Sequence, residues 1–236
     1  MSCLLHIETS TTVCSVALSL NGEAFFEKVS FHGPSHAALL GVYVEEALAR
    51  LTHEALHPDA IAVSGGPGSY TGLRIGVSMA KGLCFGYDIP LVAVPTLEIL
   101  AAKVIAQTSP SNGEPLYCAM LDARRMEVYA ALFNRNRQMV RQTRAEIVTA
   151  DTYASFLALN KVYFLGNGAA KCKEVIASPQ AVFVDDIHPL AVDMIPVAEE
   201  LFQAGKLEDT AYFEPFYLKE FMATTPKNKL FTHDKH

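Results

Sequence analysis

One arrangement of strands, turns and helices dominates this sequence and limits the folds open to it. Three strand-like runs come first, "CLLHIETS", "VCSVALSLNG" and "EAFFEKVS". The dipeptide Asn21-Gly22, which ends the second run, is typical of a hairpin turn. Helical and strand patterns then alternate: a helix over about 36–51, the strand "AIAVSGG", a helix over about 71–85, the strand "PLVAV" and a helix over 97–106. This order predicts a β-β-β-α-β-α unit.

The same order begins again after the linker-like segment "QTSPSNGEP" at 107–115. With Glu8 placed over Asp122 and no gap, "IETSTTVCSVALSLNG" lies over "LDARRMEVYAALFNRN", and apolar positions coincide. Further on, "VYFLGNGAAK" repeats the strand-to-glycine step of "IAVSGGPG". A chance match between two hairpins is the alternative to duplication. Duplication predicts an α/β chain with a duplicated actin-like (ribonuclease-H-like) fold, its two tandem β-β-β-α-β-α type units differing because the second is reduced in helix.

The linker suggests how the chain divides. We expect an N-terminal actin-like subdomain at 1–108, a C-terminal one at 109–222 and a mobile tail at 223–236. The last clear helical pattern, "LAVDMIPVAEELFQAG" at 190–205, is expected to pack back on the first subdomain.

Composition narrows the class of protein. The net charge of −6 argues against a chain that grips nucleic acid alone, because such chains usually carry a basic face. The five cysteines are scattered, form no CxxC pair and fall largely in apolar runs, which favours reduced thiols. No signal-peptide pattern and no apolar run of about 18 residues is present. We therefore expect a cytoplasmic protein without a membrane segment.

The stretch "SGGPGSYTGLRIG" at 64–76 resembles a phosphate cradle, but the known templates fail. The chain contains no Gly-Lys-Ser or Gly-Lys-Thr, and the G-x-G-x-x-G spacing is one residue too long. Two interpretations stay open: glycines that shape a turn, or an anion site at a helix N-terminus. The anion-site candidates are Gly66, Gly68, Ser69 and Thr71, and no cofactor is expected.

The two helices near this stretch are unusually apolar. Along the second, small residues recur every fourth position, at Gly72, Gly76, Ala80 and Cys84. Glycine inside a helix costs about 1 kcal/mol relative to alanine, so Gly76 indicates close packing, against the protein's own sheet or against a partner helix. Two helices short of polar surface predict an apolar patch that binds a protein. The predicted interface residues are Leu39, Leu40, Tyr43, Val44, Ala47, Leu73, Gly76, Val77, Ala80 and Leu83.

Catalytic signals are weak. The loop "ETSTT" after the first strand lies where an actin-like kinase holds phosphate, but its acid is Glu8 and no glycine follows until Gly22. We expect Glu8 to accept hydrogen bonds from loop N–H groups. His32 and His36 form H-x-x-x-H, yet Gly33-Pro34 keeps them off one helical face, so no metal site is expected.

Taken together, these segments resemble the TsaB (YeaZ) family. The match lies in "IETSTTVCSVAL", "GGPGSYTGLRIGVSMAKGL", "LDARRMEVYAALF" and "FEPFYLKE", which follow one another in the same order as in the family, over roughly 1–222. The resemblance implies a non-catalytic dimerisation subunit that pairs with the transferase TsaD, with the ATPase TsaE joining the pair. It implies a role in threonylcarbamoylation of the adenosine next to the anticodon in tRNAs that read codons beginning with A.

The resemblance implies that the first two helices supply the dimer surface and that tRNA is reached only through the complex. The apolar surface of these helices also favours a homodimer when the free protein has no TsaD partner. Glu8 departs from the aspartate of many relatives. The alternatives are a stand-alone actin-like ATPase or kinase, motivated by the glycine loop and Glu8, and a metallopeptidase-like hydrolase, motivated by His32 and His36.

Overall fold

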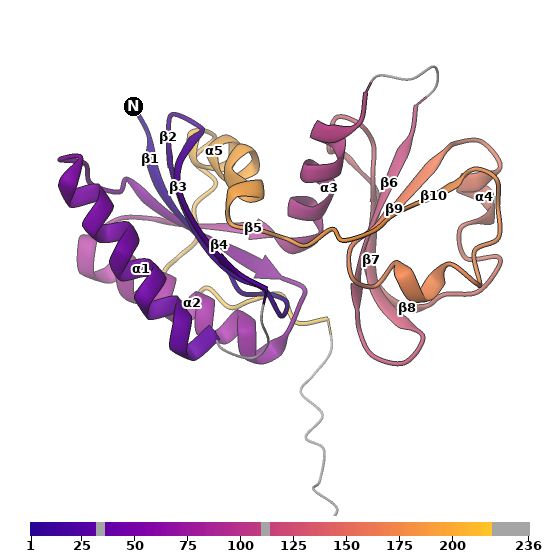
Figure 1. Cartoon of the computed structure of the whole chain (residues 1–236), viewed down its shortest axis with the longest axis horizontal. Coiled ribbons are helices and arrows are strands. Elements are labelled where there is room, and N and C mark those ends of the chain that lie inside the picture. Colours follow the sequence, from indigo (N-terminus) through magenta and orange to yellow (C-terminus); the bar gives the residue numbers. More distant parts are fainter. Residues whose placement is uncertain (32–35, 110–113, 219–236) are drawn as a thin grey trace, which may run out of the picture.

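The computed structural model describes residues 1–31, 36–109 and 114–218, which form two lobes, each built on a five-stranded mixed sheet (Figure 1). The first lobe contains β1 (Cys3–Glu8), β2 (Cys14–Leu20), β3 (Glu23–Ser30), α1 (His36–His53), β4 (Ala60–Gly66), α2 (Tyr70–Tyr87), β5 (Leu91–Pro95) and, from near the end of the chain, α5 (Ile195–Gln203). The remaining elements are α3 (Thr96–Gln107), β6 (Leu116–Asp122), β7 (Glu127–Phe133), β8 (Met139–Ile147), α4 (Ala154–Leu157), β9 (Val162–Leu165), η1 (Ala170–Cys172), β10 (Ala181–Val184) and η2 (Val192–Met194).

The first sheet has the order β3-β2-β1-β4-β5. β1, β2 and β3 are antiparallel neighbours, whereas β4 and β5 run parallel to β1. Every residue of β1 is buried because both faces of this central strand are covered: Leu5 and Ile7 share a cluster with α1 and α2, and Leu4 shares one with α5. The edge strand β3 is half-exposed along its length. The hairpin turn lies at Asn21-Gly22, as predicted, with φ of 50° and 82°.

The second sheet repeats this topology. Its order, β10-β9-β6-β7-β8, is the first order read from the other edge, with β6 in the place of β1. It carries little helix, since α4 has four residues and η1 three. The predicted fold class is confirmed: a duplicated actin-like α/β fold whose second unit is reduced in helix.

The residue-level alignment of the two units is wrong by one position beyond the first strand. Glu8 pairs with Ser15 across the first hairpin, whereas Asp122 pairs with Val128 across the second. The second connection is one residue shorter and turns through Arg124 and Arg125, both at positive φ (69° and 52°). A gap-free alignment therefore matches residues of β2 and β7 that are not equivalent in their hairpins.

The helices α3 and α5 connect the two lobes. α3 packs Leu100 and Val104 with the cluster around β6, and its Ile99 joins the cluster of the first sheet. η2 and α5 occupy most of the expected 190–205 helix, and Val197 and Ala198 pack against β4 and β5. The chain thus returns to its first sheet after completing the second (Figure 1).

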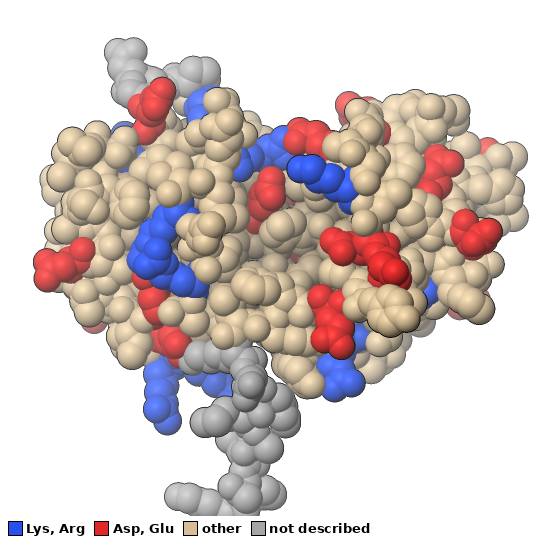
Figure 2. Space-filling view, turned by 180° about the vertical axis from the view of Figure 1, so that it is seen from behind, with Lys and Arg blue, Asp and Glu red and all other residues tan. Residues whose placement is uncertain are grey.

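Charges are dispersed over one face of the molecule. On the face seen in Figure 2, basic and acidic side chains lie interspersed over both lobes, with broad uncharged areas between them. That face carries no extended basic surface of the kind that nucleic-acid-binding proteins show. None of the described helices has the length and apolarity needed to cross a bilayer.

Candidate functional site

In the glycine loop at 64–72, other parts of the protein's own backbone occupy the space beside the glycines. Gly66 has φ of 100°, and a Cβ there would lie 2.7 Å from the carbonyl oxygen of Phe216. At Gly68 an added Cβ would lie 2.4 Å from the carbonyl oxygen of Ser10. The Ser69 N–H donates to that same oxygen at 2.6 Å, and Ser69 Oγ accepts the N–H of Gly72 as the N-cap of α2. These contacts favour the turn-geometry interpretation of this loop over the anion site, and Thr71 lies exposed beyond them.

The small residues every fourth position face inward. Gly72, Gly76, Ala80 and Cys84 are all buried. An added Cβ at Gly72 would lie 2.1 Å from the carbonyl oxygen of Thr9, and one at Gly76 would lie 2.2 Å from Thr9 Oγ1. Of the two interpretations of this row, packing within the protein itself is the one observed.

Most of the predicted interface residues are in the core. Leu40, Val44, Ala47, Leu73, Gly76, Val77 and Ala80 are buried within the chain. They lie on the faces of α1 and α2 that cover the first sheet, so their side chains are not available to a partner. Leu39, Tyr43 and Leu83 are half-buried at the edge of the same cluster. The surface that a partner could reach therefore lies on other sides of the same two helices, α1 and α2.

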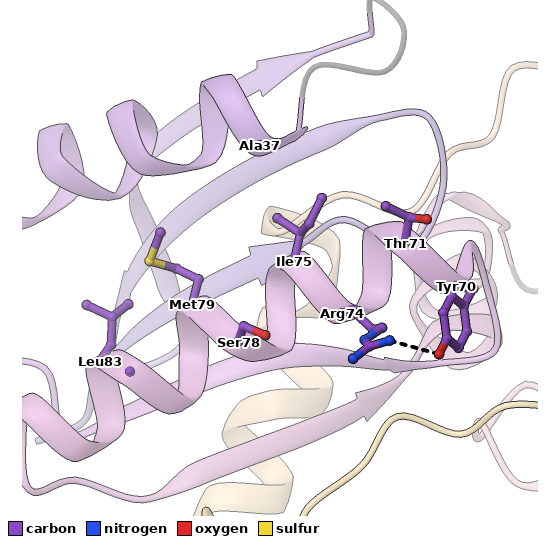
Figure 3. A pocket seen from close by; sticks show the side chains of 9 residues that line it. Ala37, Tyr70, Thr71, Arg74, Ile75, Ser78, Met79 and Leu83 are labelled. Atoms are coloured by element: carbon purple, nitrogen blue, oxygen red, sulfur yellow. Dashed lines mark hydrogen bonds between the residues drawn. The ribbon is translucent and has the colours of Figure 1, made fainter.

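That surface contains an open groove of about 790 Å³ along α2, reaching the start of α1. Its lining residues are Ala37, Tyr70, Thr71, Arg74, Ile75, Ser78, Met79, Gly82 and Leu83. Figure 3 shows Ile75, Met79 and Leu83 pointing toward the side of α1, one turn apart. Arg74, Ser78 and Gly82 have the same spacing on the neighbouring side of α2, so an apolar row lies beside a polar, small-residue row.

The N-terminal end of the groove is organised by a cation–π contact and a pair of tilted tyrosine rings. Arg74 Nη1 donates to the hydroxyl of Tyr70 at 2.9 Å, and its guanidinium lies 5.3 Å from the centre of that ring (Figure 3). The Tyr70 ring in turn lies 4.9 Å from the ring of Tyr217. The segment near the chain's end is therefore part of this site.

This segment, 206–218, is fixed along the first lobe by backbone contacts. The Glu208 N–H donates to the Leu91 carbonyl at 2.9 Å, and the Phe216 N–H donates to the Gly65 carbonyl at 2.8 Å. Lys81 Nζ donates to the carbonyls of residues 211 and 213, at 3.0 and 3.2 Å. This segment is thus bonded both to strands of the first sheet and to the Lys81 side chain of α2.

Glu8, the acid of the would-be phosphate loop, is enclosed. Its side chain is fully buried, and the Ser10 N–H donates to its Oε1 at 2.5 Å, which confirms that it accepts a loop N–H. Burial raises the pKa of Glu8 to about 7, against the opposing effect of the hydrogen bond from the Ser10 N–H.

Of the two histidines considered as metal ligands, the structure describes only His36. His36 Nε2–H donates to the Thr11 carbonyl at 2.7 Å, and His32 lies outside the described residues. Within residues 1–31, 36–109 and 114–218, no group of three His, Cys, Asp or Glu side chains could hold a metal ion.

Known proteins of similar sequence and fold share this architecture. A family model described as "TsaD: tRNA N6-adenosine threonylcarbamoyltransferase" matches residues 32–225. The "tRNA threonylcarbamoyladenosine biosynthesis protein TsaB" of Escherichia coli (strain K12) is 30% identical over 228 residues, covering 93% of this chain and 96% of its own. The protein of the same name from Bacillus subtilis (strain 168) is 30% identical over 73% of this chain and 74% of its own. The chain belongs to the TsaB family.

A solved structure described as YeaZ from Pseudomonas aeruginosa agrees with this assignment. It is 27% identical, covers 92% of this chain and 100% of its own, and superposes with a TM-score of 0.76. The similarity spans both lobes of this TsaB-family chain, so it covers the groove, the glycine loop and the second sheet alike.

Sequence reasoning missed the residues that line the groove of this TsaB-family chain, apart from Thr71 and Leu83. Arg74, Ser78 and Gly82 recur every fourth residue, as the buried small residues do, and that spacing was the available signal. Tyr217 could not have been found, because only the fold brings it to Tyr70.

Proposed function

We propose that this chain is the non-catalytic subunit that pairs with a TsaD-type transferase for threonylcarbamoylation of the adenosine next to the anticodon in tRNAs that read codons beginning with A. The observation that carries the proposal is the open, mainly apolar groove that α1 and α2 leave uncovered by the described chain. The names of the curated TsaB relatives support the pathway. Val42 on α1 is 48% exposed and Phe85 on α2 is 88% exposed, so apolar surface extends beyond the groove.

The enclosed phosphate loop supports a non-catalytic role. Glu8 is sealed from solvent, and the backbone of Ser10 is covered by Gly68 and Ser69, where a kinase of this fold would need space for phosphate. The stand-alone ATPase or kinase is disfavoured for this reason. The hydrolase alternative loses support because His36 is committed to the Thr11 carbonyl.

The remaining partners are proposed from the chain's membership of the TsaB family. A TsaE-type ATPase joins the pair, and tRNA is reached through the complex, in keeping with the net charge of −6 and the dispersed charges of Figure 2. A second copy of the chain covers the α1–α2 surface when the transferase is absent. All five cysteines are buried free thiols, in keeping with a cytoplasmic protein.

Binding to a purified TsaD-type transferase from the same organism tests the proposal. Size-exclusion chromatography and calorimetry at micromolar concentration should show a stable pair. Replacing the exposed groove residue Ser78 by arginine should weaken the pair, whereas Ser155→Arg, at an exposed site on α4 of the second lobe, should not. If the wild-type chain forms no complex, or if both variants bind as it does, the proposal is wrong.

A further inference from the structure

Gly82 is a glycine that the fold of the chain does not need. It lies inside α2 and lines the groove, and an added Cβ would meet nothing within 4 Å. Gly76, on the same helix, differs because its added Cβ would run into Thr9. Gly86, near the end of the same helix, has equally free surroundings but does not line the groove. Glycine weakens a helix interior relative to alanine, and no contact in the described chain accounts for the glycine at position 82, inside the groove.

Arg74 is the charged member of the groove lining. Tyr70 positions its guanidinium through one hydrogen bond and one cation–π contact, and the ring of Tyr217 packs against the ring of Tyr70. Across the described ranges of the chain, no Asp or Glu lies within ion-pair distance of it. A guanidinium fixed at the edge of an apolar groove without a carboxylate is suited to pair with one from a partner.

We propose that Gly82 and Arg74 determine which protein segment the groove accepts. The segment approaches Gly82 so closely that no Cβ fits between them, and it places an aspartate or glutamate carboxylate on the guanidinium of Arg74. Eight residues of α-helix separate the two points, so the carboxylate lies about 12 Å along the axis from the close contact. Ile75, Met79 and Leu83 pack beneath the same segment. The inference rests on the proposed function, with the TsaD-type transferase as the occupant.

Gly82→Ala separates folding from binding. The variant should melt at a higher temperature than wild type, because alanine favours the helix and meets no obstacle. Its dissociation constant for the purified transferase should nevertheless rise about tenfold, because a methyl group over-packs a close contact. Gly86→Ala is the matched control: its Cβ also meets nothing within 4 Å, it lies on α2, and it does not line the groove. It should melt higher and bind as wild type does.

Arg74→Gln tests the charge. It should weaken binding about tenfold and make the dissociation constant less dependent on salt, whereas Arg74→Lys should keep most of the salt dependence. Tyr70→Phe removes the hydroxyl that Arg74 donates to but leaves the cation, so it should weaken binding less than Arg74→Gln.

The outcomes distinguish this inference from the proposed function. If wild type binds the transferase but Gly82→Ala binds equally well, or Arg74→Gln leaves affinity and salt dependence unchanged, the inference is overturned and the proposed function stands. If wild type itself does not bind, both are overturned.

Discussion

Gly76→Ala should destabilise this protein even though alanine is the better helix former. The added Cβ would lie 2.2 Å from Thr9 Oγ1 and 3.4 Å from Thr9 Cβ. Thr9 is fully buried, and its Oγ1 donates to the Gly72 carbonyl at 2.8 Å. Because threonine is branched at Cβ and enclosed, it cannot turn away without losing this bond or meeting another wall.

The change in the free energy of unfolding is the sum of one stabilising and two destabilising contributions. Alanine in place of glycine favours the helix by about 1 kcal/mol. Over-packing a well-filled core costs about 1–3 kcal/mol, and loss of the Thr9 hydrogen bond costs about 1 kcal/mol more. The free energy of unfolding should therefore fall by about 2 kcal/mol, which for a chain of this size lowers the melting temperature by about 4–8 °C.

Thermal unfolding followed by circular dichroism at 222 nm measures the change. Gly82→Ala is the control on the same helix, and its melting temperature should rise by about 2–4 °C, since its Cβ meets nothing within 4 Å. In the double variant with Thr9→Ala, the damage should be smaller than the sum of the single effects, because the clashing oxygen is gone. A Gly76→Ala protein as stable as wild type, or two strictly additive effects, would refute the reasoning.

Three further outcomes follow from other contacts. Burial raises the pKa of Glu8 to about 7 in the folded state, so the folded protein retains a proton that the unfolded chain releases, and the free energy of unfolding should fall as pH rises from about 4.5 to about 7. Glu8→Gln should flatten the dependence of melting temperature on pH in that window. Glu146→Ala should lower stability by about 3–5 kcal/mol in denaturant titrations, because it strands the largely buried cation of Arg141. Lys81→Met should speed proteolysis within 206–218, with little change in melting temperature, because it releases two carbonyl contacts of that segment.

Much of the fold was predictable because its local signals agree with one another. Continuous apolar strands such as "CLLHIE", the Asn21-Gly22 turn and the alternation of helix and strand gave the correct order of elements in the first lobe. The second lobe was predictable only in outline, because its later strands are joined by irregular segments that contain only the short helices α4 and η1. Its alignment to the first lobe failed where Arg124 and Arg125 tighten the connection by one residue. The division into subdomains at 1–108 and 109–222 stays a prediction.

The candidate site was less predictable for a physical reason. Periodicity locates a face on a helix but does not say whether the protein's own sheet or another protein covers it. α2 has small residues on two faces: Gly76 and Ala80 are buried against the first lobe, whereas Ser78 and Gly82 are exposed in the groove. Both rows have the same spacing, so the sequence could not show which row is buried and which is exposed.

Strong hydrophobicity pointed to a face that the fold buries, for a reason that applies to any protein that must persist before its partner arrives. A surface made of Leu40, Val44 and Val77 would be costly to expose in the free chain, and the fold buries all three. The uncovered groove instead combines half-buried apolar side chains with Arg74 and Ser78, which water can solvate until a partner replaces it. Under the proposed function, the signal for the docking face is a row of polar or small residues that interrupts an apolar helix at intervals of four. In this chain the row is Arg74, Ser78 and Gly82, and at Gly82 we expect a single added methyl group to favour folding and oppose binding.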